Sequence, residues 1–426
     1  MRFFIPFFDH PVKRCLLRNY LLISTLLVLC ACSGKSKEKD PVAVITPADS
    51  INNAQKLSPA EFASYERAVR HFYDSAFRKG RFNGSILVAK NGEIIFEEYN
   101  GFRHPRLKKD SITPNTSFHL ASVSKTFTAM AALKLSEEGR LNINDSISKY
   151  LDSFPSPGVT IKTLMNHRSG LPNYVHYMEE LGWDKKQPVT NQAVLDFIIG
   201  RHDEIQIGRP DRRFSYSNTN YALLALVIEK VTGLSFAQYM KLAFFDPLDM
   251  QDTYVFTMAD SARSLPSYFN NGRQYAFDFL DQVYGDKNIY STARDLLKWD
   301  QALQNGHFTK QTIEAAYTPY SFEKPGINNY GLGWRMFVLK NGKKFIYHNG
   351  WWHGYRTAFY RLVEENVTII ALSNNDYKRV YSAKKIADIF GRYFNREEER
   401  SSNVITGTSR NAKGSSASQQ SASFSR

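Results

Sequence analysis

Strand-like segments lie near both ends of this sequence, and a long helical block separates them. Two aliphatic runs in 84–99 flank Asn91-Gly92, the strongest local signal for a β-hairpin. Strand patterns return only at 334–339, 344–348, 357–362 and 367–373, whereas 125–245 is typical of helices interrupted by Pro and Gly. The order predicts an α+β fold: one antiparallel sheet flanked by the first and last helices (an α/β sandwich), plus an all-helical subdomain.

Helix boundaries follow from local signals. Ser58, with Pro59 and Glu61 in the next turn, is typical of a helix start, and a closing helix is expected at about 382–394. Hydrophobic residues make up 42% of the chain, enough for a large core, which excludes disorder for most of it.

The first 31 residues are typical of an export signal. Lys13, Arg14 and Arg18 precede an apolar run that is too short to span a bilayer as an ordinary helix. The run ends in Leu29-Cys30-Ala31-Cys32, which resembles a bacterial lipobox, so we expect lipid on Cys32 and an exported lipoprotein facing the periplasm or the cell surface. The alternatives are a cleaved signal with chance cysteines, or an uncleaved anchor.

The rest of the chain divides by composition. We expect a tether at 32–56, one folded domain at 57–397 and a disordered Ser-rich tail at 398–426. All three cysteines (Cys15, Cys30 and Cys32) lie in or beside the signal, so the domain has no disulfide and no cysteine nucleophile. No metal-ligand or cofactor-binding pattern occurs, so no metal and no cofactor is expected. The net charge of +14 suits anionic surfaces, but no concentrated basic run indicates nucleic-acid binding.

The pattern Ser-x-x-Lys occurs five times, and only Ser122/Lys125 precedes a long apolar-periodic helix. There a serine lies at the positive end of a helix dipole, and a lysine one turn later returns to the same face. A desolvated lysine can deprotonate a hydroxyl. The plain alternative is a helix-capping serine. The nearest match to the Gly-x-Ser-x-Gly elbow contains Ser235, which we interpret as a helix cap.

Two further motifs carry polar groups suited to such a serine. Tyr216-Ser-Asn218 precedes a helix, and its hydroxyl and amide can relay a proton and hold a lysine. His348-Asn349-Gly350 falls between two late strands, where a glycine allows close backbone approach. A helix-entry turn and an aromatic strand end are the corresponding structural interpretations.

Ser122-x-x-Lys125, Tyr216-x-Asn218 and His348-Asn349-Gly350, in this order, resemble the serine β-lactamase and penicillin-binding-protein superfamily. The nearest branch is similar to class C β-lactamases, D-Ala-D-Ala carboxypeptidases and family VIII esterases. The resemblance covers roughly 60–395 and implies a β-lactamase/DD-peptidase-like fold.

By resemblance, Ser122 is the nucleophile, and Lys125 and Tyr216 share the acid/base work. Asn218, His348, Asn349 and Gly350 orient Lys125 or the substrate.

The resemblance further implies an oxyanion hole formed by the backbone N–H groups of Ser122 and Trp351. His167, in a recurrent family segment, is expected to be buried and structural.

The third motif departs from the Lys-Thr-Gly of many β-lactamases, because a titratable imidazole replaces a permanent cation. Arg356 could replace that cation, and the bulky Trp351-Trp352 could narrow the site. Asn288 stands where relatives often have Gly, and the sequence alone offers no interpretation of it.

We therefore expect a lipid-anchored serine hydrolase acting on an ester, an amide or a D-amino-acid peptide, with dedicated β-lactamase activity less favoured. The alternative is a non-hydrolytic cell-wall peptide-binding protein on the same scaffold. The expected partners are a small-molecule or peptide substrate and, through Cys32, a lipid bilayer.

Overall fold

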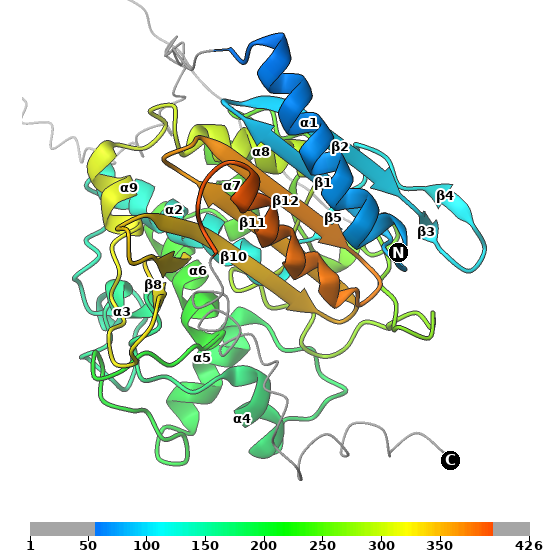
Figure 1. Ribbon diagram of the computed structural model, residues 1–426. Helices are drawn as coiled ribbons and strands as arrows, with labels where there is room; N and C mark the ends of the chain where they lie inside the picture. Colours follow the sequence, from blue (N-terminus) through cyan, green and yellow to red (C-terminus); the bar gives the residue numbers. More distant parts are fainter. Residues whose placement is uncertain (1–55, 395–426) are drawn as a thin grey trace, which may run out of the picture. The chain divides into compact units, whose positions relative to one another are not determined.

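The computed structural model describes residues 56–394, and the predicted signal, most of the tether and the whole of the predicted tail lie outside them. A seven-stranded antiparallel sheet has the order β2-β1-β12-β11-β10-β9-β8 (Figure 1). Its strands are β1 (Gly84–Lys90), β2 (Glu93–Asn100), β8 (Asn328–Tyr330), β9 (Arg335–Val338), β10 (Lys344–Trp352), β11 (Tyr355–Leu362) and β12 (Val367–Ser373).

The first and last strands of the sheet are neighbours in space, as predicted. Gly84 lies opposite Ser373 and Lys90 opposite Val367 in an antiparallel pair. Asn91 and Gly92 adopt φ values of 54° and 79°, the left-handed conformation that an Asn-Gly hairpin turn needs. The predicted hairpin and the α+β class are both confirmed.

Helices cover both faces of the sheet. α1 (Pro59–Tyr73) begins with the predicted capping box of Ser58 and Glu61. It packs on one face together with a 3-10 helix, η6 (Lys378–Ile389) (Figure 1). The closing helix was expected at about 382–394, but η6 begins earlier, because the chain turns at Tyr377 directly after the last strand, and it ends at Ile389.

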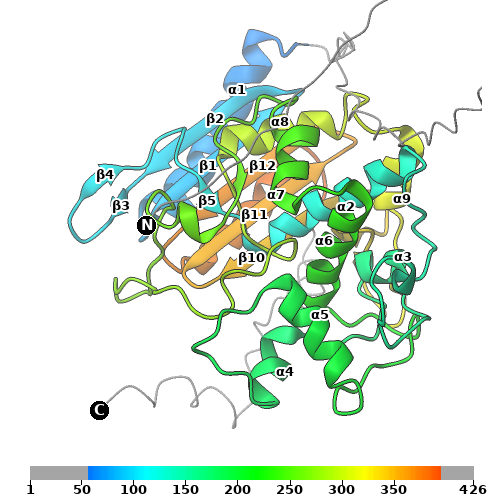
Figure 2. The same cartoon turned by 180° about the vertical axis from the view of Figure 1, so that it is seen from behind.

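The helices on the other face include the predicted helical block (Figure 2). The long α2 and α6 pack against each other, and α3, α5 and α7 pack on α6. These helices are α2 (Ser124–Glu137), α3 (Ile161–Met165), α4 (Tyr174–Glu180), α5 (Asn191–Gly200), α6 (Thr219–Thr232), α7 (Phe236–Met240), α8 (Ala293–Ala302) and α9 (Lys310–Ala316). Each face has its own hydrophobic core.

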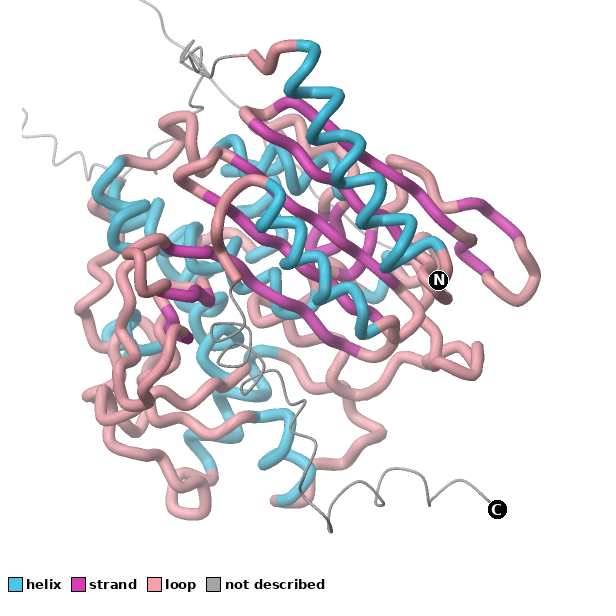
Figure 3. The backbone as a smooth tube through the Cα atoms, viewed as in Figure 1, coloured by secondary structure: helices cyan, strands magenta, loops and turns pink. Residues whose placement is uncertain are grey.

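Short elements connect these layers (Figure 3). Two small sheets pair β3 (Phe102–His104) with β4 (Lys109–Ser111), and β7 (Ile289–Ser291) with both β5 (Phe118–His119) and β6 (Tyr254–Val255). Short 3-10 or π turns are η1 (Asp74–Arg78), η2 (Ala121–Val123), η3 (Ile147–Lys149), η4 (Lys241–Phe245) and η5 (Met258–Asp260).

Within 56–394, no single helix has the length and apolar content to cross a membrane. The pair 219–232 and 236–245 meets those criteria only together, with a bend of 76°.

Candidate active site

Ser122 lies in the short 3-10 turn η2, directly before α2, and its side chain is partly buried. The cap position of α2 is occupied by Val123, and no side chain caps this helix. The helix-cap interpretation of Ser122 is therefore wrong. The Ser122 hydroxyl instead accepts a hydrogen bond of 3.1 Å from Lys125 Nζ.

Lys125 is fully buried, and three acceptors surround its amine. Besides the serine, Nζ donates to Asn218 Oδ1 at 2.8 Å and to the backbone carbonyl of Asp286 at 2.7 Å. Asn218 is at the cap position of α6, where an asparagine side chain normally holds the helix end, yet it makes no capping bond there. Its amide oxygen is thus committed to the lysine.

Tyr216 lies above this lysine. Lys125 Nζ is 5.2 Å from the centroid of the tyrosine ring. The buried His167 packs on the same ring at 4.2 Å, and its Nδ1 accepts the Ser217 N–H. The expectation of a buried, hydrogen-bonded His167 is confirmed, and its contact with Tyr216 adds a support for that ring.

Arg335, which the sequence analysis did not single out, contributes a permanent positive charge at this place. Its guanidinium is 4.8 Å from the Tyr216 ring centroid and 5.8 Å from that of Tyr330, and its side chain is only partly buried. Arg335 begins strand β9, where the alternating pattern gave no functional signal.

Arg356 does not supply a cation here. It pairs with Asp376 and covers the Trp351 ring at 4.4 Å.

The third motif lies inside β10, not between two strands as predicted. Side chains of a strand alternate between the faces of the sheet. Phe345 and Tyr347 join the core under α1 and η6, and Ile346 joins the core on the helical side. By this alternation His348, Gly350 and Trp352 face the side of Ser122, whereas Asn349 and Trp351 face the opposite layer.

The opposite placement of Asn349 and Trp351 is visible in their contacts. Asn349 lies opposite Ala358 of β11, a residue of the core under α1 and η6. The Trp351 ring is 64% exposed and stacks with Arg356. The structure therefore brings His348 and Gly350 toward Ser122 but not the side chains of Asn349 and Trp351.

Gly350 allows β10 to approach the segment before Ser122 closely. A Cβ at this position would lie 2.3 Å from the carbonyl oxygen of Leu120 and 2.1 Å from Thr357 Oγ1. Thr357 in turn donates to the Leu120 carbonyl at 2.8 Å. Any larger residue at position 350 pushes the strand away from Ser122.

The backbone around Ser122 and Trp351 can supply two N–H donors. Trp352 and Tyr355 face each other across the two-residue turn His353-Gly354, so they form the hydrogen-bonded pair. Alternation along an antiparallel ladder then directs the Trp351 N–H away from β11, toward the edge where η2 contacts β10.

His348 is fully buried and neutral. Burial, followed by the charges of Arg335 and Lys125, lowers its pKa well below the ordinary value of 6.5. Its Nε2 lies 3.1 Å from the Tyr330 hydroxyl, and its ring is 6.4 Å from Tyr216. His348 thus fills its place without a charge, and Arg335 carries the charge instead.

A second buried lysine lies beside the first. Lys287 contacts the Tyr174 hydroxyl, which donates to Asp286 Oδ2 at 3.1 Å. Burial lowers the pKa of Lys287. This cluster fixes the residue whose carbonyl holds Lys125.

Asn288 has a structural role. Its φ of 75° explains why a glycine fits this place in relatives. Its amide bridges His119 and the carbonyls of Asp281 and Val283.

His119 makes the backbone before Ser122 sensitive to acid. Its Nδ1 accepts the Ala121 N–H at 2.9 Å and Nε2 lies 2.8 Å from Asn288 Oδ1, so it is the neutral Nε2–H tautomer. Burial lowers its pKa to about 4. Below pH 6.5 the His119 imidazole takes up a proton in the unfolded chain but stays unprotonated in the native protein.

We therefore expect the free energy of unfolding to be fully retained above about pH 6.5 and to decrease by about 3 kcal/mol from His119 alone as the pH falls toward 4. Urea unfolding at a series of pH values measures this slope. His119→Gln should flatten the slope by one proton, and an unchanged slope in this variant would contradict the assignment.

Known proteins resemble this chain in sequence and in fold. The family model described as Beta-lactamase matches residues 65–390. A penicillin-binding protein of Bacillus subtilis strain 168 is 32% identical over 333 residues, which cover 74% of this chain and 72% of that protein.

Two solved structures show the same fold. The octameric penicillin-binding protein homologue from Pyrococcus abyssi has a TM-score of 0.63 at 25% identity and covers 76% of this chain and 77% of its own. The D-amino acid amidase from Ochrobactrum anthropi SV3 has a TM-score of 0.62 at 21% identity, with 80% and 99% covered.

Proposed function

Since this chain belongs to the beta-lactamase family and is a serine hydrolase, we propose that Ser122 attacks an ester or amide carbonyl beside a carboxylate, as in a peptide that ends in a D-amino acid. The observation that carries this proposal is Arg335, a partly buried arginine whose guanidinium is 4.8 Å from the Tyr216 ring centroid. Guanidinium groups bind carboxylates in a two-pronged geometry.

Lys125 is the base in this proposal. A neutral lysine has two N–H bonds and one lone pair. Asn218 Oδ1 and the Asp286 carbonyl accept the two N–H bonds, so the lone pair is directed at the Ser122 hydroxyl. Nucleophilic attack then transfers the serine proton to Lys125 while the Oγ–carbon bond forms.

Two further groups complete the acylation step. The N–H groups of Ser122 and Trp351 stabilise the oxyanion, each by about 3 kcal/mol. Tyr216 relays the proton to the leaving amine or alcohol as the scissile bond breaks. Water then hydrolyses the acyl-enzyme by the same route in reverse and regenerates Ser122.

The leaving group occupies the end of the site at Tyr216, His348 and Arg335. Because Tyr216 protonates the departing atom, the carboxylate of a departing D-amino acid lies within reach of Arg335. A neutral His348 cannot hold that carboxylate by charge.

A matched pair of substrates tests the role of Arg335. We expect turnover of a D-Ala-D-Ala peptide with a free carboxylate, and weaker turnover of its C-terminal amide. Arg335→Gln should raise KM for the free acid about ten- to a hundredfold, the contribution of a hydrogen bond to a charged group. KM for the amide and for a neutral aryl ester should stay within about twofold, which is within ordinary mutational scatter.

Two controls make the result specific. Arg335→Lys should restore part of the loss. Arg356→Gln changes an arginine on the other face of the sheet and should leave the substrate preference unaltered. If Arg335→Gln raises KM for the free acid and for the amide by the same factor, Arg335 does not bind the carboxylate. A chromogenic cephalosporin in the same panel measures β-lactam hydrolysis.

We also propose that the enzyme is anchored by lipid on Cys32, supported by the lipobox-like Leu29-Cys30-Ala31-Cys32. In a bacterial host the wild-type chain should fractionate with membranes, and Cys32→Ser should shift most of it to the soluble fraction. Metabolic labelling with a fatty acid should mark the wild type alone. Membrane retention of an unlabelled Cys32→Ser chain would support an uncleaved anchor instead.

A further inference from the structure

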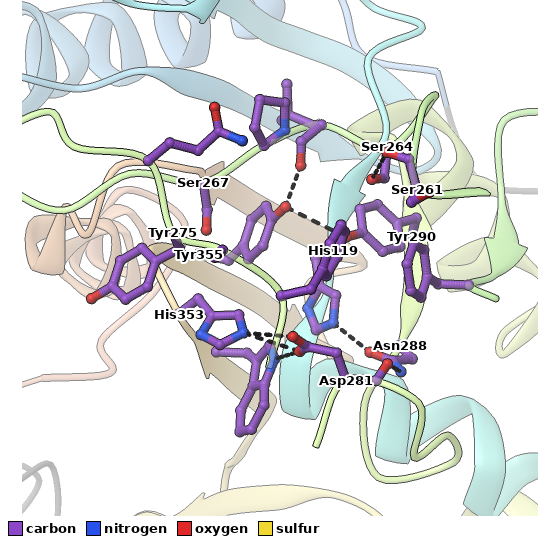
Figure 4. Close-up of a pocket in the computed structure, with 17 residues that line it drawn as sticks. His119, Ser261, Ser264, Ser267, Tyr275, Asp281, Asn288, Tyr290, His353 and Tyr355 are labelled. Carbon is purple, nitrogen blue, oxygen red and sulfur yellow. Dashed lines mark hydrogen bonds and ion pairs between the residues drawn. The ribbon is translucent and has the colours of Figure 1, made fainter. Parts of the chain in front are cut away.

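An aromatic pocket lies beside the Trp352 end of β10, away from Tyr347, the β10 residue that pairs with Arg335. Its volume is about 270 Å³. Figure 4 shows His119, Tyr290 and Tyr355 around it, with Asp281 and His353 at its edge. Its aromatic walls are Phe256, Tyr275, Phe277, Tyr290, Trp352 and Tyr355.

The pocket shares its walls with the catalytic backbone. His119 lines it and accepts the Ala121 N–H one residue before the nucleophile. Trp352 also lines it and directly follows Trp351, whose N–H faces η2. Because the leaving group lies at the Tyr216 end of β10, the acyl group points to the Trp352 end, toward this pocket.

The charge of the pocket is opposite to that of the chain. The whole protein has a net charge of +14, yet no lysine or arginine of the described residues lines the cavity; Lys287 lies behind one wall, with Nζ 4.7 Å from the centroid of Trp352. His119, whose pKa is lowered to about 4 by burial, adds no charge at neutral pH. The carboxylate of Asp281 is at its edge, with a side chain only 5% exposed.

Asp281 is held in a fixed orientation. It accepts a 2.6 Å bond from Trp352 Nε1, and His353 Nε2 lies 3.0 and 3.1 Å from its two oxygens. The carboxylate of Asp278 is within 4.8 Å of this cluster. Asp278 and Asp281 set two carboxylates against the single histidine His353, so a further positively charged group is attracted there by ion pairing and, at the aromatic faces, by cation–π contact.

We propose that this pocket is an acyl-side specificity site that selects substrates whose acyl group carries a primary ammonium. The inference rests on the proposed function, because it assigns the acyl group of the same reaction. Asp281 is a specificity residue in it, and the aromatic walls enclose the chain that bears the amine.

A series of aryl esters measures the preference. ω-Aminoalkanoyl esters of increasing chain length are compared with alkanoyl esters of equal length, using the soluble full domain and tail from Ser33. At the chain length that places the amine beside Asp281, we expect kcat/KM for the amino ester to exceed that of its alkanoyl partner about tenfold.

Matched variants identify which carboxylate binds the ammonium group of the substrate. Asp281→Asn retains an acceptor for Trp352 and should lower the ratio to about one, as expected when the ion pair is lost. Asp278 bonds neither Trp352 nor His353, and Asp278→Asn should lower the ratio of kcat/KM partly. This variant therefore still tests the proposal if Asp281→Asn fails to fold. Asp110→Asn removes an exposed carboxylate at a separate cavity and should change nothing.

The possible outcomes distinguish a failure of the ammonium site from a failure of the proposed hydrolase function. Turnover of both ester series with equal rates overturns the ammonium site and leaves the hydrolase intact. No turnover and no labelling of Ser122 by a fluorophosphonate overturns the proposed function itself. If calorimetry shows Zn²⁺ binding that is lost in Asp278→Asn, while the ester ratio stays at one, the cluster of Asp278, Asp281 and His353 binds a metal and not an amine.

Discussion

Ser122→Ala is expected to lower kcat at least about ten-thousandfold on every substrate that the enzyme turns over, since the covalent route is lost with the hydroxyl. Lys125, Asn218 and the Asp286 carbonyl form their contacts independently of the serine, so the fold should be retained. Steady-state kinetics and labelling by a fluorophosphonate measure the loss, and circular dichroism tests the fold.

Ser235→Ala is the matched control for this experiment. Ser235 belongs to the nearest match of the Gly-x-Ser-x-Gly pattern, but its hydroxyl caps α7 through the Gln238 N–H. Its replacement should cost about 1 kcal/mol of stability and leave kcat unaltered. Turnover that survives in Ser122→Ala would remove Ser122 as nucleophile. Binding of a peptide without turnover by the wild type would favour a cell-wall peptide-binding protein.

The largest expected loss of stability follows from Asp300→Ala. Asp300 of α8 and Arg361 of β11 pair in the core, with side chains 2% and 1% exposed. Asp300 also accepts bonds from Thr368 of β12 at 2.5 Å and from Gln304 at 2.7 Å. Removing the carboxylate leaves a buried guanidinium without its counter-charge, which costs about 3–5 kcal/mol.

Urea unfolding of the soluble domain measures this loss. Glu314→Ala breaks an exposed pair with Lys310, whose side chain is 91% exposed, and should cost less than about 0.5 kcal/mol. Asp300→Asn retains an acceptor for Thr368 and should fall between the two. A loss below about 1 kcal/mol in Asp300→Ala would mean that water or Tyr317 compensates Arg361.

The sequence predicts the sheet and its first hairpin because their signals are local. Asn91-Gly92 favours a left-handed turn, and the aliphatic runs beside it favour strands. The Ser58 capping box predicts α1 for the same reason. The end of the closing helix is less determined, because the packing of η6 on β11 and β12 decides it.

The candidate site is predictable as far as side chains in motifs define it. Ser122, Lys125 and Asn218 meet because Ser-x-x-Lys spans one helical turn and Asn218 lies at the entry to the neighbouring α6. The carbonyl of Asp286 was not predictable, since every residue has one. Arg335 was not predictable either, because its guanidinium reaches Tyr216 from a strand of the sheet and not from a motif.

The structure was needed to show which side chains of β10 point to which face of the sheet. Placing His348-Asn349-Gly350 between strands removes the alternation that separates neighbouring side chains. Once the segment is a strand, period-two geometry alone puts Asn349 and Trp351 opposite His348. Arg356 is the cross-strand partner of Trp351, so it lies on the same face as Trp351 and outside the site.

The pairing of β1 with β12 has a consequence for how this protein is made. A growing chain emerges from its N-terminus, so the hairpin of β1 and β2 exists long before the residues around Ser373 are synthesised. Until then one edge of β1 is open to any other strand, which is a hazard for aggregation. A chain that stops before β12 therefore lacks the strand that joins β1 to β11, and β11 carries the Thr357 that ties the sheet to Leu120. Under the export proposed from the segment that ends at Cys32, passage through the membrane comes first and completion of this sheet second.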